Sequence, residues 1–221
     1  MTLILPMIGS GYIPAGGGGG ITFVGSITKE VFAGTNFNTP AESIDVLSVA
    51  SVGDLVVLSL TAATNTNNAT TFGGMPMATI RDDHLSSVPA SFLGYRIVQA
   101  GDSNPYLSSN TGFYRFLRLG IIAAVFRGAS GVVGASEVAN NSSGMPDPPS
   151  ATSNDSLRVI VGHLKASNVT MTAPAGFNLS GAAGTTSSAI AYQIDNFGTV
   201  NPAAFGGGGS ADWRSEHVTF S

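Results

Sequence analysis

The chain has no cysteine, which excludes disulfide bonds and thiolate metal sites and leaves the redox compartment unindicated. Charge is also scarce, since only 10% of the 221 residues are Asp, Glu, Lys or Arg, against about 25% in typical globular proteins. Nine scattered Lys and Arg residues and a net charge of −4 argue against nucleic acid as a partner. A surface so poor in charge suits a protein that is covered within an assembly.

Long apolar runs are absent, and the helix-forming residues Glu, Lys, Leu, Arg and Gln are scarce. No run approaches the roughly 18 apolar residues that would span a membrane, so we expect no membrane partner. The apolar N-terminus lacks a preceding basic stretch and is interrupted by Pro6, which is atypical of a signal peptide, so we expect a soluble, unprocessed chain. Abundant Gly, Ser, Thr and Asn, together with 43% hydrophobic residues, predict short strands and tight turns around a real core.

The second half of the chain repeats the first at an offset of roughly a hundred residues. Order and spacing agree at several places, although each match alone is weak. The matching segments are 54–58 with 156–161, 72–75 with 174–177, 91–96 with 188–193, 101–105 with 196–202, and 119–126 with 213–220. The repeated positions are mostly Leu, Val, Tyr, Gly and Pro, so the repeat predicts a duplicated scaffold and gives no indication of a reaction.

We expect an N-terminal arm at residues 1–20 and one domain at 21–221. Its halves, about 21–139 and 150–221, would be joined by the proline-rich segment 140–155. Each half has too few large side chains for an independent core, so both should close over one core. The fold class predicted is all-β, a two-sheet antiparallel β-sandwich, jelly-roll-like, built from two related halves. Strands are expected near 21–27, 29–32, 43–49, 55–60, 77–81, 92–99, 119–126, 131–137, 157–164, 169–172, 187–194 and 213–220.

The arm joins an apolar octet to five consecutive glycines at 16–20. One interpretation is a flexible leader, because glycine runs have high backbone entropy. The other is an anchor that docks into a neighbouring subunit through Leu3, Ile4, Leu5 and Ile8.

Residues typical of active sites occur without the patterns that chemistry needs. His84, His163 and His217 each stand alone, and Asp82, Asp83 and His84 together read as ordinary turn residues. No Gly-x-Ser-x-Gly elbow occurs, and both glycine runs precede strands instead of helices. Residues 102–104 and Asp147 offer oxygen ligands for calcium, but in no recognised ligand pattern. We therefore expect no enzyme, no catalytic or metal residue and no cofactor.

The aromatic residues leave two interpretations open. Trp213, with Tyr95, Tyr106, Tyr114 and Tyr192, could stack on a sugar or could fill the core. The bulky, basic segment 113–118 would either pack under the sandwich or contact another subunit. Its candidate partner-binding residues are Tyr114, Arg115, Phe116 and Arg118.

Several segments together resemble a known group of proteins. They are 53–57 (GDLVV), 95–98 (YRIV) followed by Gly101-Asp102, 123–128 (AAVFRG), 174–177 (PAGF) and 213–220 (WRSEHVTF). With the glycine-rich leader, they are similar to the virion proteins of tailed bacteriophages that form β-sandwich modules as accessory head or tail components. The resemblance covers residues from about 20 to 221, and the group has no catalytic residues to carry over.

The resemblance implies a non-enzymatic bacteriophage structural protein, either a capsid decoration or a tail or fibre component. It would be assembled in the bacterial cytoplasm, located in the virion and held there through its N-terminal arm. Its partners would be other virion proteins and further copies of itself in a homo-oligomer. The alternative is a carbohydrate-binding or receptor-recognition (adhesin) module of a phage tail, with a host-surface glycan as ligand.

Overall fold

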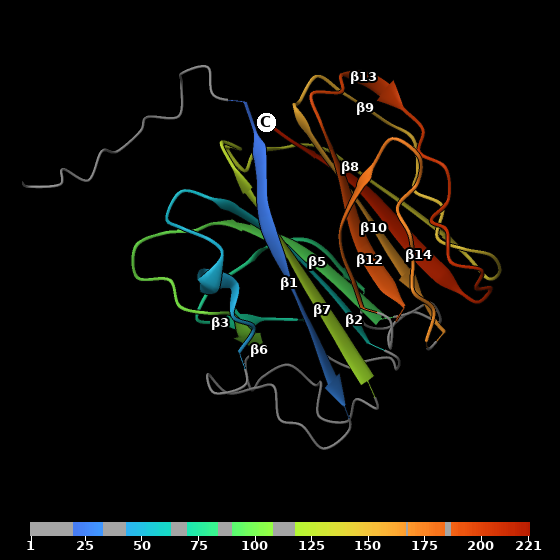
Figure 1. Cartoon of the computed structure of the whole chain (residues 1–221), viewed down its shortest axis with the longest axis horizontal. Helices are drawn as coiled ribbons and strands as arrows, with labels where there is room; N and C mark the ends of the chain where they lie inside the picture. Colours follow the sequence, from blue (N-terminus) through green and yellow to red (C-terminus); the bar gives the residue numbers. More distant parts are fainter. Residues whose placement is uncertain are drawn as a thin grey trace, which may run out of the picture.

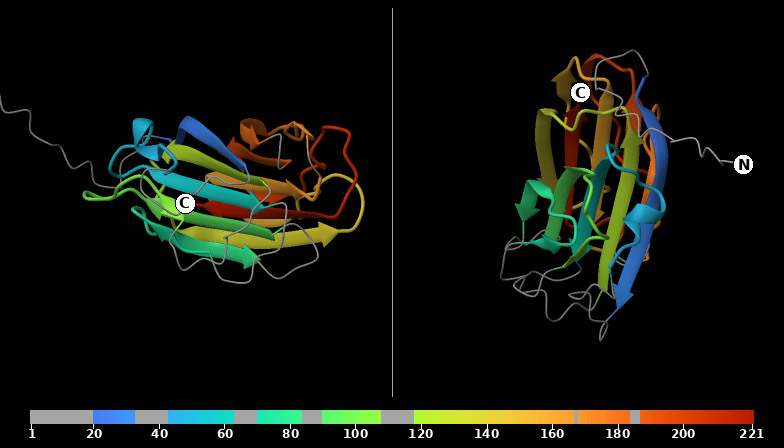
Figure 2. Two further views of the ribbon diagram at one scale, coloured as in Figure 1. Left: turned by 90° about the horizontal axis from the view of Figure 1, so that it is seen from below. Right: turned by 90° about the vertical axis from the view of Figure 1, so that its left-hand side faces the viewer.

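A computed structural model describes residues 20–32, 43–62, 70–83, 90–107, 118–166, 168–183 and 187–221. It consists of two five-stranded antiparallel sheets that pack face to face (Figures 1 and 2). The predicted all-β, two-sheet antiparallel sandwich is therefore confirmed.

Each half of the chain makes one complete sheet. In spatial order, the first sheet is β1 (Thr22–Phe32), β7 (Arg118–Arg127), β2 (Leu55–Ala62), β5 (Ala90–Ile97) and β4 (Ala78–Asp83). The second is β8 (Val133–Asn141), β14 (Trp213–Phe220), β10 (Leu157–Leu164), β12 (Ser188–Ile194) and β11 (Asn178–Ala183). Two short pairs cover the sheets, β3 (Phe72–Gly73) with β6 (Tyr106–Leu107) and β9 (Ala151–Ser153) with β13 (Gly198–Val200).

The two sheets have the same strand order and the same register. Identical residues face each other at the same end of each sheet: Leu55, Ile97 and Phe126 in the first, and Leu157, Ile194 and Phe220 in the second. The β-bulges also recur, in β1 and β8 near their starts and in β4 and β11 after their second residue. This correspondence confirms that the sandwich is built from two related halves.

The connectivity differs from the jelly-roll-like prediction. In a jelly roll successive strands alternate between the two sheets, whereas here the chain completes one sheet before it starts the other. β8 pairs with β14, so the second sheet begins at Val133, and the connection between sheets is the turn at 128–132. Gly128 and Gly131 both have positive φ there, as a sharp reversal requires. The proline-rich segment 140–155 lies within the second sheet's half, where it includes the end of β8 and all of β9.

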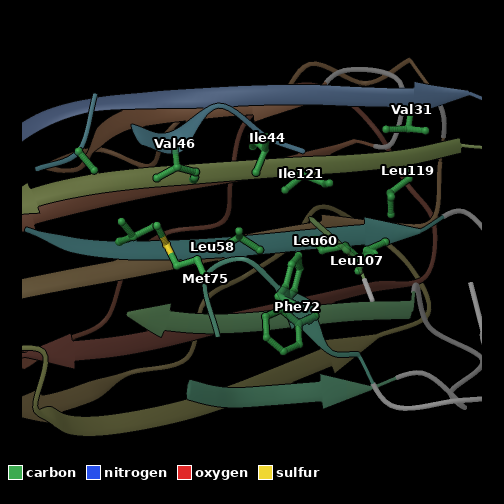
Figure 3. Packing of buried hydrophobic residues seen from close by; sticks show 14 of the residues in the cluster. Val31, Ile44, Val46, Leu58, Leu60, Phe72, Met75, Leu107, Leu119 and Ile121 are labelled. Atoms are coloured by element: carbon green, nitrogen blue, oxygen red, sulfur yellow. The ribbon is translucent and has the colours of Figure 1, made fainter. Parts of the chain in front are cut away.

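Apolar side chains fill three layers. One lies between the sheets, and the other two cover their outer faces. Figure 3 shows the outer layer of the first sheet, where Ile44, Val46, Phe72, Met75 and Leu107 pack onto the strands. Every residue of β2 and of β10 is buried, because both faces of these central strands are covered. The continuous apolar run at 55–60 predicted this arrangement.

Some local predictions were wrong. Residues 43–49 do not form a strand but contain the short 3-10 helix η2 (Val46–Ser48), which inserts Val46 into the outer layer. Residues 169–172 contribute only an isolated bridge between Thr172 and Gly206. β11 was not predicted, because its sequence Asn-Leu-Ser-Gly-Ala-Ala shows little alternation of apolar and polar residues.

Candidate functional site

The space between the sheets is apolar at one end and polar at the other. Leu157, Val159 and Val161 lie in the apolar layer between the sheets, so the next alternate residue of β10, His163, faces the same space. The polar end holds Ser59, Thr61 and Ser91 from the first sheet and His163, Ser188, Arg214 and Glu216 from the second, all buried. We call these seven residues the inter-sheet polar cluster.

A hydroxyl, an imidazole and a carboxylate follow one another across this cluster. Oγ1 of Thr61 lies 2.5 Å from Nδ1 of His163, which joins β2 to β10. Nε2 of His163 lies 3.1 Å from Oε2 of Glu216, an ion-pair distance, although the two atoms lack the alignment of a hydrogen bond. The chain of contacts therefore runs from one sheet into the other.

A second ion pair crosses between the sheets beside the first. Nη1 of Arg214 contacts Oδ2 of Asp83, which links β14 to β4. The hydroxyls of Ser59, Ser91 and Ser188 have no hydrogen-bond partner among the residues the structure describes. Buried polar atoms without hydrogen-bond partners lower stability, so the cluster makes this end of the core less stable than an apolar filling would.

The order of Thr61, His163 and Glu216 is that of a nucleophile, a base and an orienting acid. Their exposed fractions are 1%, 0% and 1%, so no substrate can reach the hydroxyl in this structure. In this structure the contacts of Thr61 and His163 join the two sheets at this end.

A second buried polar group lies on the outer face of the second sheet. Arg158 is fully buried and donates to the backbone carbonyls of Asn196 at 2.7 Å, Gly198 at 2.5 Å, and Ala151 and Ser153 at 3.2 Å each. These bonds hold β9 and β13 onto the sheet. Burial lowers the pKa of Arg158, and the nearby Asp155 carboxylate acts in the opposite direction.

His217 lies next to this guanidinium. Its Nδ1 is 2.8 Å from the carbonyl of Pro149, and its Nε2 is 3.5 Å from Nη1 of Arg158. Burial lowers the pKa of His217 and the Arg158 charge lowers it further, which together outweigh the opposing effects of the Pro149 carbonyl and Glu137. The lowered pKa favours the neutral imidazole, which lies between the Pro149 carbonyl and the Arg158 guanidinium.

The residues considered for calcium are used internally or stand apart. The Asp102 carboxylate accepts from Arg96 at 3.0 Å and 3.1 Å and from the Gln99 amide at 2.8 Å. Burial would raise the pKa of Asp102, but the hydrogen bonds from Arg96 and Gln99 and the Arg96 charge together lower it. Asn104 bonds to Asp45 and to the Leu47 amide. Across the described ranges, no group of three or more His, Cys, Asp or Glu is placed to hold a metal ion.

The aromatic residues considered for sugar stacking mostly fill the core. Trp213 is only 6% exposed, and its Nε1 donates to the Ser143 carbonyl at 2.9 Å. Tyr192 stacks on Phe23 with ring centres 4.7 Å apart, and Tyr95 meets Phe220 edge-on. Of the aromatic side chains in the described part of the chain, Phe197 is the exposed one, at 55%. No stacking platform is formed by Trp213.

All but one of the predicted partner-binding residues fall outside the described structure. Leu3, Ile4, Leu5 and Ile8 belong to the arm, and Tyr114, Arg115 and Phe116 precede β7. Arg118 begins β7, where its backbone pairs with Phe32, but nothing is described of its side chain. His84 also lies outside the described ranges. The proposed contacts of these residues therefore remain predictions.

Sequence reasoning missed the buried charges, although the repeat contained a signal for them. The shared register places Arg158 at the position of Val56, Glu216 at that of Ile122 and Arg214 at that of Gly120. A charge at a position that is apolar in the other half marks a buried group. Applying the repeat residue by residue would have found all three.

Comparison with known proteins adds no relative: no family model matches the chain, nor does any curated protein or solved structure. In the described part of the chain, no helix is long and apolar enough to cross a membrane.

Proposed function

We propose that the protein is a non-enzymatic structural component of a tailed-bacteriophage particle, held in the particle by its N-terminal arm. The observation that carries this proposal is the burial of Ile21, at the start of the sandwich domain. Its side chain lies in the layer between the sheets, so this end of the domain is held at a fixed point. An arm anchored to the particle would then orient the whole sandwich on its support.

The end of the sandwich where Ile21 lies supports the same role. The turns at this end expose apolar side chains, Val52 at 67%, Val132 at 62% and Phe197 at 55%. Exposed apolar residues near an attachment point suit a contact with a neighbouring subunit. The arm adds Leu3, Ile4, Leu5 and Ile8, each CH₂ of which contributes about 0.8 kcal/mol when it is buried against a partner.

The inter-sheet polar cluster is consistent with a scaffold, because its one relay of hydroxyl, imidazole and carboxylate is closed to solvent. The alternative of a glycan-binding adhesin gains nothing from Trp213, which lies in the core. We therefore favour the structural role alone.

Deleting residues 1–20 tests the anchor. The truncated chain should fold with an unchanged circular dichroism spectrum but should be absent from particles purified from the lysate, as measured by mass spectrometry. Normal incorporation of the truncated chain would refute the anchor.

A matched variant separates the apolar residues from arm length. Replacing Leu3, Ile4, Leu5 and Ile8 by Ser keeps the glycine run and should lower incorporation as strongly as the deletion. Absence of the intact protein from purified particles would reject the virion role itself.

A further inference from the structure

The sandwich has two flanks, each with an edge strand of one sheet and an edge strand of the other. The strands at one flank are the counterparts of those at the other, but the two flanks are packed differently. On one flank, which we call the closed flank, β11 of the second sheet packs against β1 and β7 of the first. Ser26 of β1 donates to the carbonyl of Ser180 in the β11 bulge. On the opposite flank, which we call the open flank, β8 and β4 are the counterparts of β1 and β11.

A glycine explains why the closed flank closes. A Cβ on Gly181 would lie 2.8 Å from Cγ2 of Ile122 and 3.2 Å from Oγ1 of Thr28, so only glycine lets β11 approach this closely. The shared register places Arg81 at the corresponding position of β4. β4 therefore has a long charged side chain where β11 has a glycine. Among the described strands, no comparable packing joins β4 to β8.

The inner face of β8 is therefore uncovered. Ser136 and Val138 correspond in register to Ser26 and Thr28, which β11 covers on the closed flank. On the open flank Ser136, Val138 and Asn140 are exposed, and Val138 retains 36% of its accessible surface. The fold thus covers this position with a strand in one half and leaves it partly exposed in the other.

The outer edge of β8 is also unguarded. β8 is the last strand of its sheet, and Glu137 is the one charged residue among its nine. Edge strands are commonly protected by charges, proline or bulges. β4 carries Arg81, Asp82 and Asp83 at its edge, whereas the bulge of β8 lies at Gly134 and leaves residues 135–141 regular.

We propose that β8 pairs antiparallel with β8 of a second copy of the chain, around a two-fold axis at Val138. This register sets Val138 opposite Val138, Glu137 opposite Ala139, and Ser136 opposite Asn140. Like charges directly opposite each other would destabilise the pair, and none occur: the two Glu137 side chains are diagonal neighbours, not directly opposed. The exposed valines bury each other. A two-fold axis uses the same patch on both copies, so the edge backbone groups of one β8 pair with those of the other.

This inference specifies a partner within the proposed assembly role, yet its test is separate from that role. Because the chain has no cysteine, Val138→Cys places a single thiol on the proposed axis. Directly opposed residues have Cα atoms about 4.5–5.5 Å apart, within the range that a disulfide spans. With diamide as oxidant, the full-length variant should form a covalent dimer. Leu179→Cys on β11, an edge residue 43% exposed, is the matched control and should stay monomeric on a denaturing gel.

A second variant tests the contact without cross-linking. In sedimentation velocity over a range of concentrations, the intact chain should reach twice its monomer mass. Val138→Lys, which opposes two ammonium groups, should raise the dimer Kd at least about tenfold. Leu179→Lys should leave the Kd unchanged.

A chain that stays monomeric, or a dimer that neither Val138→Lys weakens nor Val138→Cys traps, would overturn the pairing. Failure to find the chain in particles while Val138→Cys cross-links would reject the virion role and leave the pairing standing. Loss of particle attachment on deletion of residues 1–20, with dimerisation retained, would support both.

Discussion

Gly181 lies in β11 where that strand packs against β1 and β7. A Cβ added to Gly181 would lie 2.8 Å from Cγ2 of Ile122. Glycine within an ordinary strand lowers stability, so replacing it by alanine there raises the free energy of unfolding by roughly 0.5–1 kcal/mol. Here the opposite sign is expected, because the methyl group would force β11 away from β1.

Gly181→Ala should lower the free energy of unfolding by about 1–3 kcal/mol, the usual cost of overpacking a well-filled contact. Urea denaturation followed by circular dichroism measures this difference. Gly20→Ala is the control, since nothing lies within 4 Å of its added Cβ. A stabilising effect at Gly181 would show that the closed flank can relax.

At the level of elements, the short strands β9 and β13 depend on a side chain beneath them. The Arg158 guanidinium donates to carbonyls in both strands and in the turn before β13. These hydrogen bonds hold the two short strands in place, since the strands have no apolar core of their own. Four acceptors would lose their donor together if the guanidinium were removed.

Arg158→Met keeps the length of the side chain and removes the donors. We expect a loss of about 3 kcal/mol of unfolding free energy, because buried carbonyls are left without partners. Hydrogen exchange should become faster at the β9 and β13 amides and stay unchanged in β2. Lys165→Met, in a half-exposed ion pair with Asp212, should cost less than about 1 kcal/mol. Equal losses for the two variants would contradict the role assigned to Arg158.

Elements with strong patterns were predictable from the sequence. The limits of β10 and β14 coincide with the predicted 157–164 and 213–220, because dense apolar residues in these central strands define them. β8 was placed in the first half because its small, neutral residues carry no information about their partner strand. The contact between Thr61 and His163 in the inter-sheet polar cluster was not predictable from spacing, since these residues meet only across the two sheets.

At the scale of the whole molecule, the inter-sheet polar cluster fixes how one sheet lies on the other. An apolar filling of the same space would bind the sheets as strongly or more strongly, but with less constraint on their relative position. The pairing of His163 with Glu216 is therefore expected to matter as a unit.

Glu216→Leu leaves His163 buried without its acid and should cost about 3–5 kcal/mol of unfolding free energy. The double variant His163→Leu/Glu216→Leu should recover much of this loss, since the space becomes apolar. A double-mutant cycle by urea denaturation measures the coupling. Additive losses from the two single variants would mean that the residues contribute independently.

The two-sheet construction has one more consequence, which concerns the order of the chain. None of the described strand pairings joins a strand before the turn at 128–132 to a strand after it, because each half completes its own sheet. The C-terminal Ser221 bonds to Ser130 and Val132 in that turn, and β1 starts at the same end of the sandwich (Figure 2). A circularly permuted chain that began at Val133 and ended at Arg127 would keep every one of these pairings. The fold thus prescribes two matched sheets and leaves open which of them is synthesised first.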